Sequence, residues 1–235
     1  MAEKHSGRAE KGSQLYLQNL INRYPEIFDS ELSKQLGREI KVNWVSPIES
    51  DNYREYRDSA FLKKLGIKNI CDSQRPLSDF WPDKGAHWDA LGKFDSQVFI
   101  VEAKGHIEEI VSPGTGATDP NYLKQIQAAL QETKKFLRIK SEYDWSKTLY
   151  QYANRLAHLY YLRECCKIDA FLIFLYFTND TSWDDYGTEY GWKCAELVVH
   201  KILGIPAKHK LSKYIRNIYI DVDKLCGITP FNVTP

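Results

Sequence analysis

The stretch Val98-Phe99-Ile100-Val101-Glu102-Ala103-Lys104 decides the fold predicted for this chain, because an unbroken apolar run ends in an acid and a base. Side chains alternate across a β-strand, so the even-numbered residues of the stretch should share one face. Val98 and Ile100 can then enter a core. The carboxylate of Glu102 and the ammonium group of Lys104 remain side by side at the end of the strand.

A second acid is expected to join this site from a neighbouring strand. Residues 87–93, which include Asp89, are predicted to form that strand, and residues 94–97 the turn of a hairpin. Carboxylate oxygens from two strands are hard ligands suited to Mg²⁺ or Mn²⁺. The other two Glu-x-Lys copies lack this context, because Glu39-Ile40-Lys41 opens an extended segment and Glu132-Thr133-Lys134 lies in a helical one.

The composition is that of one folded domain. With 235 residues, of which 43% are hydrophobic, the chain can bury a sizeable core. We expect a flexible polar tail over residues 1–13, without an apolar signal segment, and a single α/β domain over residues 14–235. No apolar run of about 18 residues is present, so no membrane partner is expected. The five cysteines follow no zinc spacing, which indicates reduced thiols in a cytoplasmic protein.

The formal net charge of +1 is small for a protein that coats duplex DNA, because phosphate neutralisation drives such binding. Contacts with nucleic acid would have to come from local patches. The best candidate is the segment from Lys201 to Arg216, since no acid occurs between Glu196 and Asp221. A solvated basic surface is the alternative interpretation.

Helices and strands are predicted to alternate along the chain, which indicates an α/β fold. Asp119-Pro120 is a strong start for a helix to about residue 139, because a capping acid precedes a proline. The apolar segment 170–177 is predicted to be a central strand covered on both faces. Residues 67–86 look irregular. The other predicted helices span residues 15–24, 29–36, 50–65, 145–166 and 188–203, and the other strands residues 40–45 and 217–222.

This order of elements resembles the core of the PD-(D/E)xK nuclease superfamily, which includes restriction endonucleases and recombination exonucleases. The matching features are the hairpin that bears Asp89, the strand that ends in Glu102-Ala103-Lys104, and the amphipathic helix and buried strand that follow. The resemblance covers residues 50–178. It implies a restriction-endonuclease-like α-β-β-β-α-β core, a mixed sheet flanked by helices, with N- and C-terminal helical additions. The family's familiar Pro-Asp pair is absent, because Asp89 follows Trp88.

The resemblance also implies roles for individual residues. In that superfamily two acids and the backbone carbonyl that follows the second acid bind Mg²⁺, and the lysine serves the attacking water. Carried over, the metal ligands are Asp89, Glu102 and the carbonyl of Ala103, and the lysine is Lys104.

Further polar residues are candidates for the rim of the site. Many members of the superfamily add an acid from the preceding helix. Here Glu55 is the candidate and Asp58 its rival, since both lie on one side of the helix predicted over residues 50–65. The residues predicted to contact substrate are His106, Gln125, Gln151, Arg155 and His158. For all of these residues a solvated surface position is the alternative.

The predicted function is Mg²⁺-dependent hydrolysis of phosphodiester bonds in nucleic acid. A carboxylate-held divalent cation makes water nucleophilic at neutral pH and stabilises charge on the phosphorane-like oxygens. DNA is preferred to RNA as the partner, and a homodimer is left open. The alternative is a catalytically silent nuclease-fold module for binding or scaffolding, which the near-neutral charge and the 15 tyrosines suit.

Overall fold

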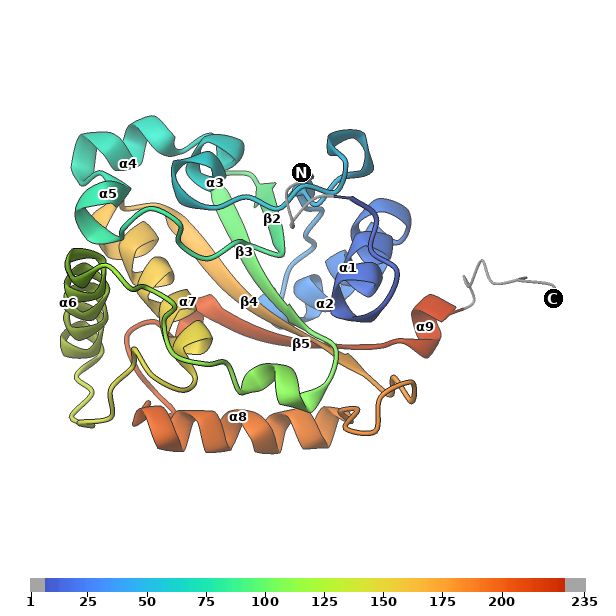
Figure 1. Ribbon diagram of the computed structural model, residues 1–235. Helices are drawn as coiled ribbons and strands as arrows, with labels where there is room; N and C mark the ends of the chain where they lie inside the picture. Colours follow the sequence, from blue (N-terminus) through green and yellow to red (C-terminus); the bar gives the residue numbers. More distant parts are fainter. Residues whose placement is uncertain (1–6, 227–235) are drawn as a thin grey trace.

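The computed structural model describes residues 7–226 of the chain. Five strands form one mixed sheet and lie side by side in chain order (Figure 1). They are β1 (Asn43–Ser46), β2 (Ala90–Phe94), β3 (Gln97–Lys104), β4 (Asp169–Thr178) and β5 (Ile215–Asp221). β2 is antiparallel to both of its neighbours, β1 and β3, whereas β4 runs parallel to β3 and β5 parallel to β4. The predicted α/β class is confirmed.

Helices precede, connect and follow the strands. The α-helices are α1 (Gly12–Arg23), α2 (Pro25–Leu36), α3 (Asp58–Leu65), α4 (Lys68–Gln74), α5 (Leu77–Phe80), α6 (Pro120–Leu137), α7 (Tyr150–Tyr160), α8 (Glu189–Leu203) and α9 (Asp223–Cys226). Single turns of 3₁₀-helix are η1 (Glu49–Asp51), η2 (Ile107–Ile110) and η4 (Ser212–Tyr214), and the π-helical turn η3 (Tyr161–Cys165) extends α7. Within residues 7–226, no helix has both the length and the apolarity that a membrane span requires.

The alternation predicted for β3 is confirmed. Val98 and Ile100 are buried in a core that also contains apolar side chains of α3, α6, α7 and α8. Phe99 and Val101 are buried on the other face, against α1 and α2. Figure 1 shows α1 and α2 on one side of the sheet and α6, α7 and α8 on the other. Glu102 continues the first face, so its carboxylate ends in the layer between the sheet and α7.

The segment predicted as a central strand is β4. It pairs with β3 along one edge and with β5 along the other. Leu172 and Phe174 enter the core on the α7 side, while Phe171 and Ile173 enter the core on the α1 side. Because β4 has hydrogen-bonded neighbours at both edges and packed layers on both faces, it can be apolar along nearly its whole length.

The helix predicted from residue 120 begins as expected. The side chain of Asp119 accepts hydrogen bonds from the backbone amides of Asn121 (2.7 Å) and Tyr122, and Pro120 takes the first helical position. This cap satisfies amides that have no partner inside the helix.

The helix predicted over residues 50–65 is wrong in its first half. Asn52 and Tyr53 both have left-handed backbone angles (φ 51° and 54°), which reverse the chain after η1, so the α-helix begins at Asp58. Residues 67–86, expected to be irregular, contain α4 and α5. The helix expected from Trp145 begins instead at Tyr150, after Leu149 with φ 67°.

The tail expected over residues 1–13 lies partly outside the described residues. Within them, the amide of Gly7 donates to the carbonyl of Asn52 (2.7 Å) and the side chain of Gln18 donates to the carbonyl of Gly7. Gly12 and Ser13 form the first turn of α1.

Candidate active site

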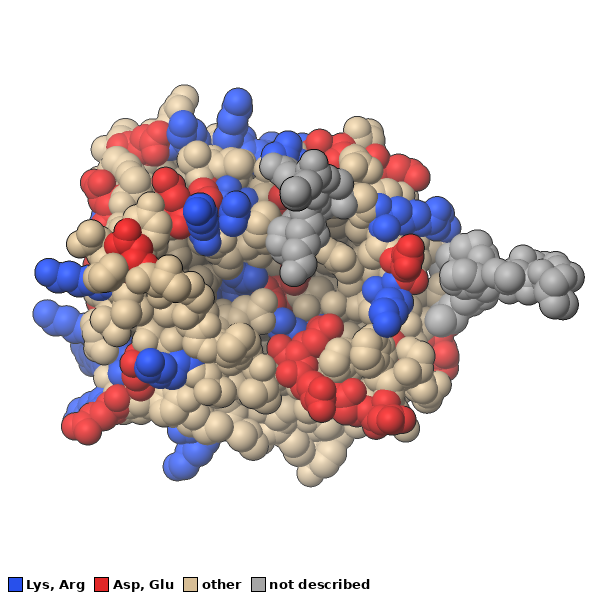
Figure 2. All heavy atoms as spheres, viewed as in Figure 1, with Lys and Arg blue, Asp and Glu red and all other residues tan. Residues whose placement is uncertain are grey.

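A cavity of about 580 Å³ lies at the end of β3. It is the hollow near the centre of the face drawn in Figure 2, where basic and acidic side chains are both visible. Its walls come from the start of α1, the segment before β2, the end of β3 and the first turns of α7. The charged and amide side chains that line it are Lys11, Gln14, Glu55, Asp89, Glu102, Lys104, Glu109, Gln151, Asn154 and Arg155.

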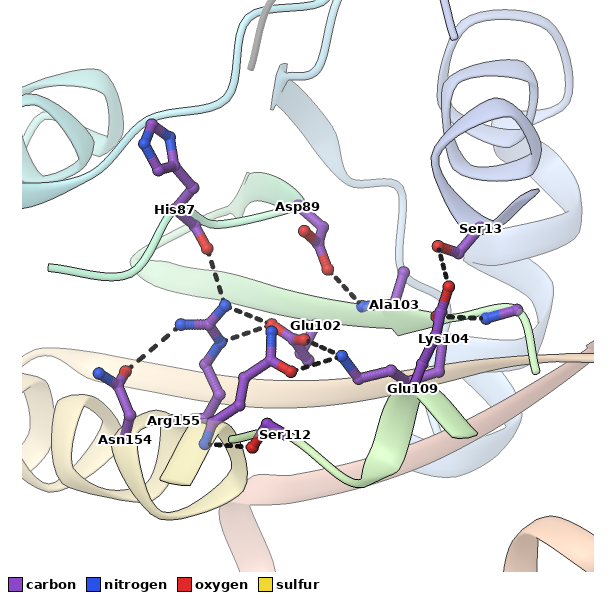
Figure 3. Close-up of polar contacts among 12 residues, drawn as sticks. Ser13, His87, Asp89, Glu102, Ala103, Lys104, Glu109, Ser112, Asn154 and Arg155 are labelled. Carbon is purple, nitrogen blue, oxygen red and sulfur yellow. Dashed lines mark hydrogen bonds and ion pairs between the residues drawn. The ribbon is translucent and has the colours of Figure 1, made fainter. Parts of the chain in front are cut away.

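Asp89 reaches the cavity from the residue before β2. Ala90 pairs with Val101, so the register continued by one residue sets Asp89 opposite Glu102. The Oδ2 atom of Asp89 accepts a hydrogen bond from the backbone amide of Ala103 (2.7 Å; Figure 3). This hydrogen bond holds the Asp89 carboxylate against β3, beyond Ala90 and Val101, the last residue pair of β2 and β3.

Glu102 is 1% exposed and its two oxygens contact two cations. Oε1 accepts from the Nζ atom of Lys104 (2.6 Å), and Oε2 accepts from the Nε atom of Arg155 (2.6 Å) and from its Nη2 atom (Figure 3). Two donors of the guanidinium therefore converge on one carboxylate oxygen, and the other oxygen is left to Lys104.

Arg155 is held in place by α7 and by the segment before β2. It is almost fully buried, its Nη2 atom donates to the carbonyl of His87 (2.8 Å), and its guanidinium lies 4.6 Å from the centre of the Trp88 ring. The Nη1 atom donates to the side chain of Asn154. These contacts compensate part of the cost of burying a cation.

Lys104 extends from the last residue of β3 between a carboxylate and an amide. Its Nζ atom donates to Glu102 and to the Oε1 atom of Gln151 (2.7 Å). Gln151 lies in the first turn of α7, where its backbone amide donates to Ser112. The ammonium group is thus fixed at the cavity wall by residues from β3 and α7 (Figure 3).

The two carboxylates have opposite pKa shifts. Burial, together with the neighbouring charges of Glu102 and Glu55, raises the pKa of Asp89 well above its ordinary range. Burial also opposes ionisation of Glu102, but Arg155 and Lys104 outweigh it and lower the pKa of Glu102. The cavity therefore has an acid that resists ionisation on the Asp89 side and a carboxylate compensated by two cations on the Glu102 side.

Glu55 lines the cavity, although not from the predicted helix. It is buried in the extended segment before α3, where Tyr56 forms an isolated β-bridge with Trp88. Its Oε1 atom accepts from the side chain of Gln14 (2.7 Å). Its rival Asp58 lies elsewhere, because that carboxylate accepts from the backbone amides of Lys84 and Gly85.

Three residues predicted to contact substrate do not line the cavity. His158 is buried in the core among Phe61, Trp81 and Trp88, where it donates from Nδ1 to the carbonyl of Asn154 (2.9 Å). Burial lowers its pKa to about 4. It lies three residues after Arg155, and the helical rotation of about 100° per residue turns its side chain away from the cavity and into the core.

The predictions that Gln125 and His106 line the cavity failed for other reasons. The Nε2 atom of Gln125 donates to the carbonyl of Ser78 (2.6 Å), so α6 uses this side chain to hold α5. β3 ends at Lys104, so His106 no longer follows the strand alternation. Its ring stacks on Trp183 at 4.2 Å and its Nδ1 atom contacts Asp185 (2.9 Å).

His106, Glu108 and Asp185 form a compact trio of metal-type ligands. One ligand atom of each lies within 4.8 Å of the others. Among the described residues, Glu55, Asp89 and Glu102 do not reach this mutual spacing. Asp185 already accepts from His106 and from the backbone amide of Glu108. We therefore treat the trio as a local hydrogen-bonded cluster, and a cation in the cavity would rely on Asp89, Glu102 and the carbonyl of Ala103.

The start of α1 belongs to the cavity, which the sequence did not indicate. Lys11, Ser13 and Gln14 line it, although the resemblance to the nuclease core covers only residues 50–178. One signal was present in Gly105, directly after the site. A Cβ atom at Gly105 would lie 3.0 Å from the backbone nitrogen of Ser13, so this glycine permits the close approach of α1.

Comparisons of this chain with protein-family models, with curated proteins and with solved structures found nothing that matches. The functional argument consequently starts from the geometry of the cavity.

Proposed function

We propose that this protein is a divalent-metal-dependent hydrolase of phosphodiester bonds in nucleic acid, built on a PD-(D/E)xK-type core. One observation carries the proposal. Asp89, just before β2, Glu102, on the paired strand β3, and Lys104, at the end of β3, line a single cavity at the surface. The mixed sheet with helices on both faces agrees with such a core.

The electrostatics of the cavity suit a divalent cation. Burial and, after it, the neighbouring carboxylates of Glu102 and Glu55 raise the pKa of Asp89, and a bound cation would stabilise its ionised form. Asp89, Glu102 and the carbonyl of Ala103 would hold the ion. When bound, a Mg²⁺ or Mn²⁺ ion supplies a nucleophilic water at neutral pH and stabilises charge on the phosphoryl oxygens.

Lys104 would act on the attacking water or on the developing charge. Gln151 and Glu102 fix its ammonium group at the cavity wall, so its position is set before a substrate arrives. A charge that is already oriented costs no reorganisation during the reaction, which makes its stabilisation of the transition state large.

A binding module without catalysis is the second candidate, and Arg155 favours it. The guanidinium grips Glu102 in the buried wall of the cavity, and a cation that used the same carboxylate would meet its positive charge. A cavity whose second acid is permanently occupied by arginine could bind an anionic group without hydrolysing it.

Calorimetric titration with Mn²⁺, beside cleavage of mixed DNA and RNA substrates, tests the proposal. The wild type should bind metal and cut, whereas Asp89→Ala should lose both activities. Asp72→Ala, which removes an exposed acid on α4, is the matched control and should behave as the wild type. If the wild type bound no Mn²⁺ and cut neither nucleic acid, the binding module would replace the hydrolase.

A further inference from the structure

Helix α8 is apolar on both its buried and its exposed side. Trp192, Val199 and Leu203 anchor it to the core. On the opposite side Tyr190 is 77% exposed, Leu197 69% and Val198 57%, with Ile202 also exposed. In Figure 1, α8 runs along the lower edge of the molecule. Soluble monomers seldom leave several large apolar side chains together on one helix in contact with water.

The exposed side chains form a regular ridge. Tyr190, the half-buried Cys194, Val198 and Ile202 follow one another at intervals of four residues, and Leu197 lies beside them. Ridges of this spacing interlock with the grooves of a second helix in the most common class of helix packing. Since α8 has 15 residues, the ridge offers a contact about 22 Å long.

The two ends of this ridge carry opposite charges. Beside the N-terminal end are Asp184, Asp185 and Glu189, of which Glu189 pairs with Lys193 (2.6 Å), and the backbone amide of Glu108 donates to Asp185 (2.8 Å), which brings a fourth acid close. The C-terminal end is followed by a basic segment without acids, which contains the exposed Lys201, Lys208 and Lys210. A surface with an acidic end, an apolar middle and a basic end is complementary to a copy of itself turned end to end.

We infer that a second copy of this chain packs on α8, with the two helices antiparallel about a two-fold axis. A two-fold axis that passes beside the exposed side of α8, level with the midpoint between Ala195 and Glu196, sets Tyr190 at the level of Lys201 of the partner subunit, and the acidic end of each copy beside the basic end of the other. The ridge is then buried and the helix dipoles oppose each other favourably. The interface is isologous, so the assembly closes as a dimer. This inference does not depend on the proposed function.

Sedimentation equilibrium over roughly 1 to 100 µM tests the inference. The wild type should show a monomer–dimer equilibrium. Leu197→Glu combined with Val198→Glu should raise the dissociation constant by at least about tenfold, because charges then enter the middle of the contact. Ile70→Glu is the matched control: Ile70 is 48% exposed on α4, and this change should leave the equilibrium unaltered. Circular dichroism verifies that each variant is folded.

Charge reversal tests the antiparallel orientation. One variant carries Asp184→Lys and Glu189→Lys, and the other carries Lys201→Glu and Lys208→Glu. Each alone should dimerise more weakly than the wild type, and mixing them should restore the dimer through opposite charges at both ends. A wild type that stays monomeric up to 100 µM, or a dimer that is insensitive to the α8 changes, overturns the inference. Reversal variants that fail to form a mixed dimer overturn the antiparallel arrangement.

Discussion

Asp89, one residue before β2, and Glu102, on the neighbouring antiparallel strand β3, face one cavity, but their charges have opposite environments. Glu102 lies between the guanidinium of Arg155 and the ammonium group of Lys104. Asp89 accepts a hydrogen bond from the amide of Ala103 and is repelled by nearby carboxylates. Ionisation of Glu102 therefore stabilises the folded protein, whereas ionisation of Asp89 destabilises it.

Asp89→Asn should stabilise the metal-free protein at neutral pH. The pKa of Asp89 is raised in the folded protein. The contribution of this residue to the free energy of unfolding is therefore present at low pH and is lost as the pH rises. Asparagine keeps an acceptor for the Ala103 amide and removes the charge. We expect a gain of about 1–3 kcal/mol, or several degrees in Tm, from thermal unfolding with chelator. A decrease in Tm would show that the charge of Asp89 is already compensated.

Glu102→Gln should have the opposite effect. It leaves the buried Arg155 and the half-buried Lys104 without their counter-charge, which should cost about 3–5 kcal/mol in urea unfolding. Because the folded pKa of Glu102 is lowered, the wild type loses this stabilisation as the pH falls, and the variant should lose less. Glu31→Gln, which breaks the surface pair with Lys34, is the control and should cost less than about 1 kcal/mol. Equal costs for the two variants would contradict the argument.

Lys104→Ala should separate metal binding from hydrolysis. A protonated lysine is no ligand for Mg²⁺, so loss of its charge should keep or slightly strengthen Mn²⁺ affinity in calorimetry. Hydrolysis should fall by about 10²- to 10⁴-fold, the range for a positioned charge-stabilising or proton-transfer group. Gln151→Ala keeps the ammonium group but removes one of its two acceptors, and should give an intermediate loss. Cleavage by Lys104→Ala at the wild-type rate would remove this lysine from the mechanism.

Metal binding should release protons. A cation needs ionised Asp89, whose pKa is raised in the free protein, so apparent Mn²⁺ affinity should increase with pH. Calorimetric titrations in buffers of different ionisation enthalpy count the protons released. Asp89→Asn cannot contribute this proton. A wild type that binds Mn²⁺ with no proton release would place the cation away from Asp89.

His158 should govern part of the acid sensitivity of the fold. Its pKa is lowered to about 4 by burial, so its contribution is present above its ordinary value near 6.5 and is lost as the pH falls towards 4. The full loss amounts to about 3 kcal/mol. In urea unfolding, His158→Leu should flatten the pH dependence between these values. Because the pKa of His209 is also lowered to about 4, the free energy of unfolding of this variant should still depend weakly on pH. An unchanged slope in His158→Leu would refute the assignment.

Local patterns were sufficient for much of the fold. Alternation along β3, the apolar length of β4 and the Asp119-Pro120 start of α6 each depend on residues close together in the chain. The same alternation, together with a hairpin turn, was enough to bring Asp89 opposite Glu102. The predicted helix over residues 50–65 failed because two left-handed residues interrupt it, and spacing of acids alone gives no sign of such backbone angles.

The sequence by itself determined the strand that ends in Glu102-Ala103-Lys104 and the acid that joins it, because backbone periodicity and turn geometry act over a few residues. The tertiary structure alone decided that Arg155 neutralises Glu102, and that α1 closes the cavity over Gly105. It also decided that His158 is buried. These outcomes depend on groups tens of residues apart, whose approach is set by the packing of whole layers, and charge and burial follow from that packing.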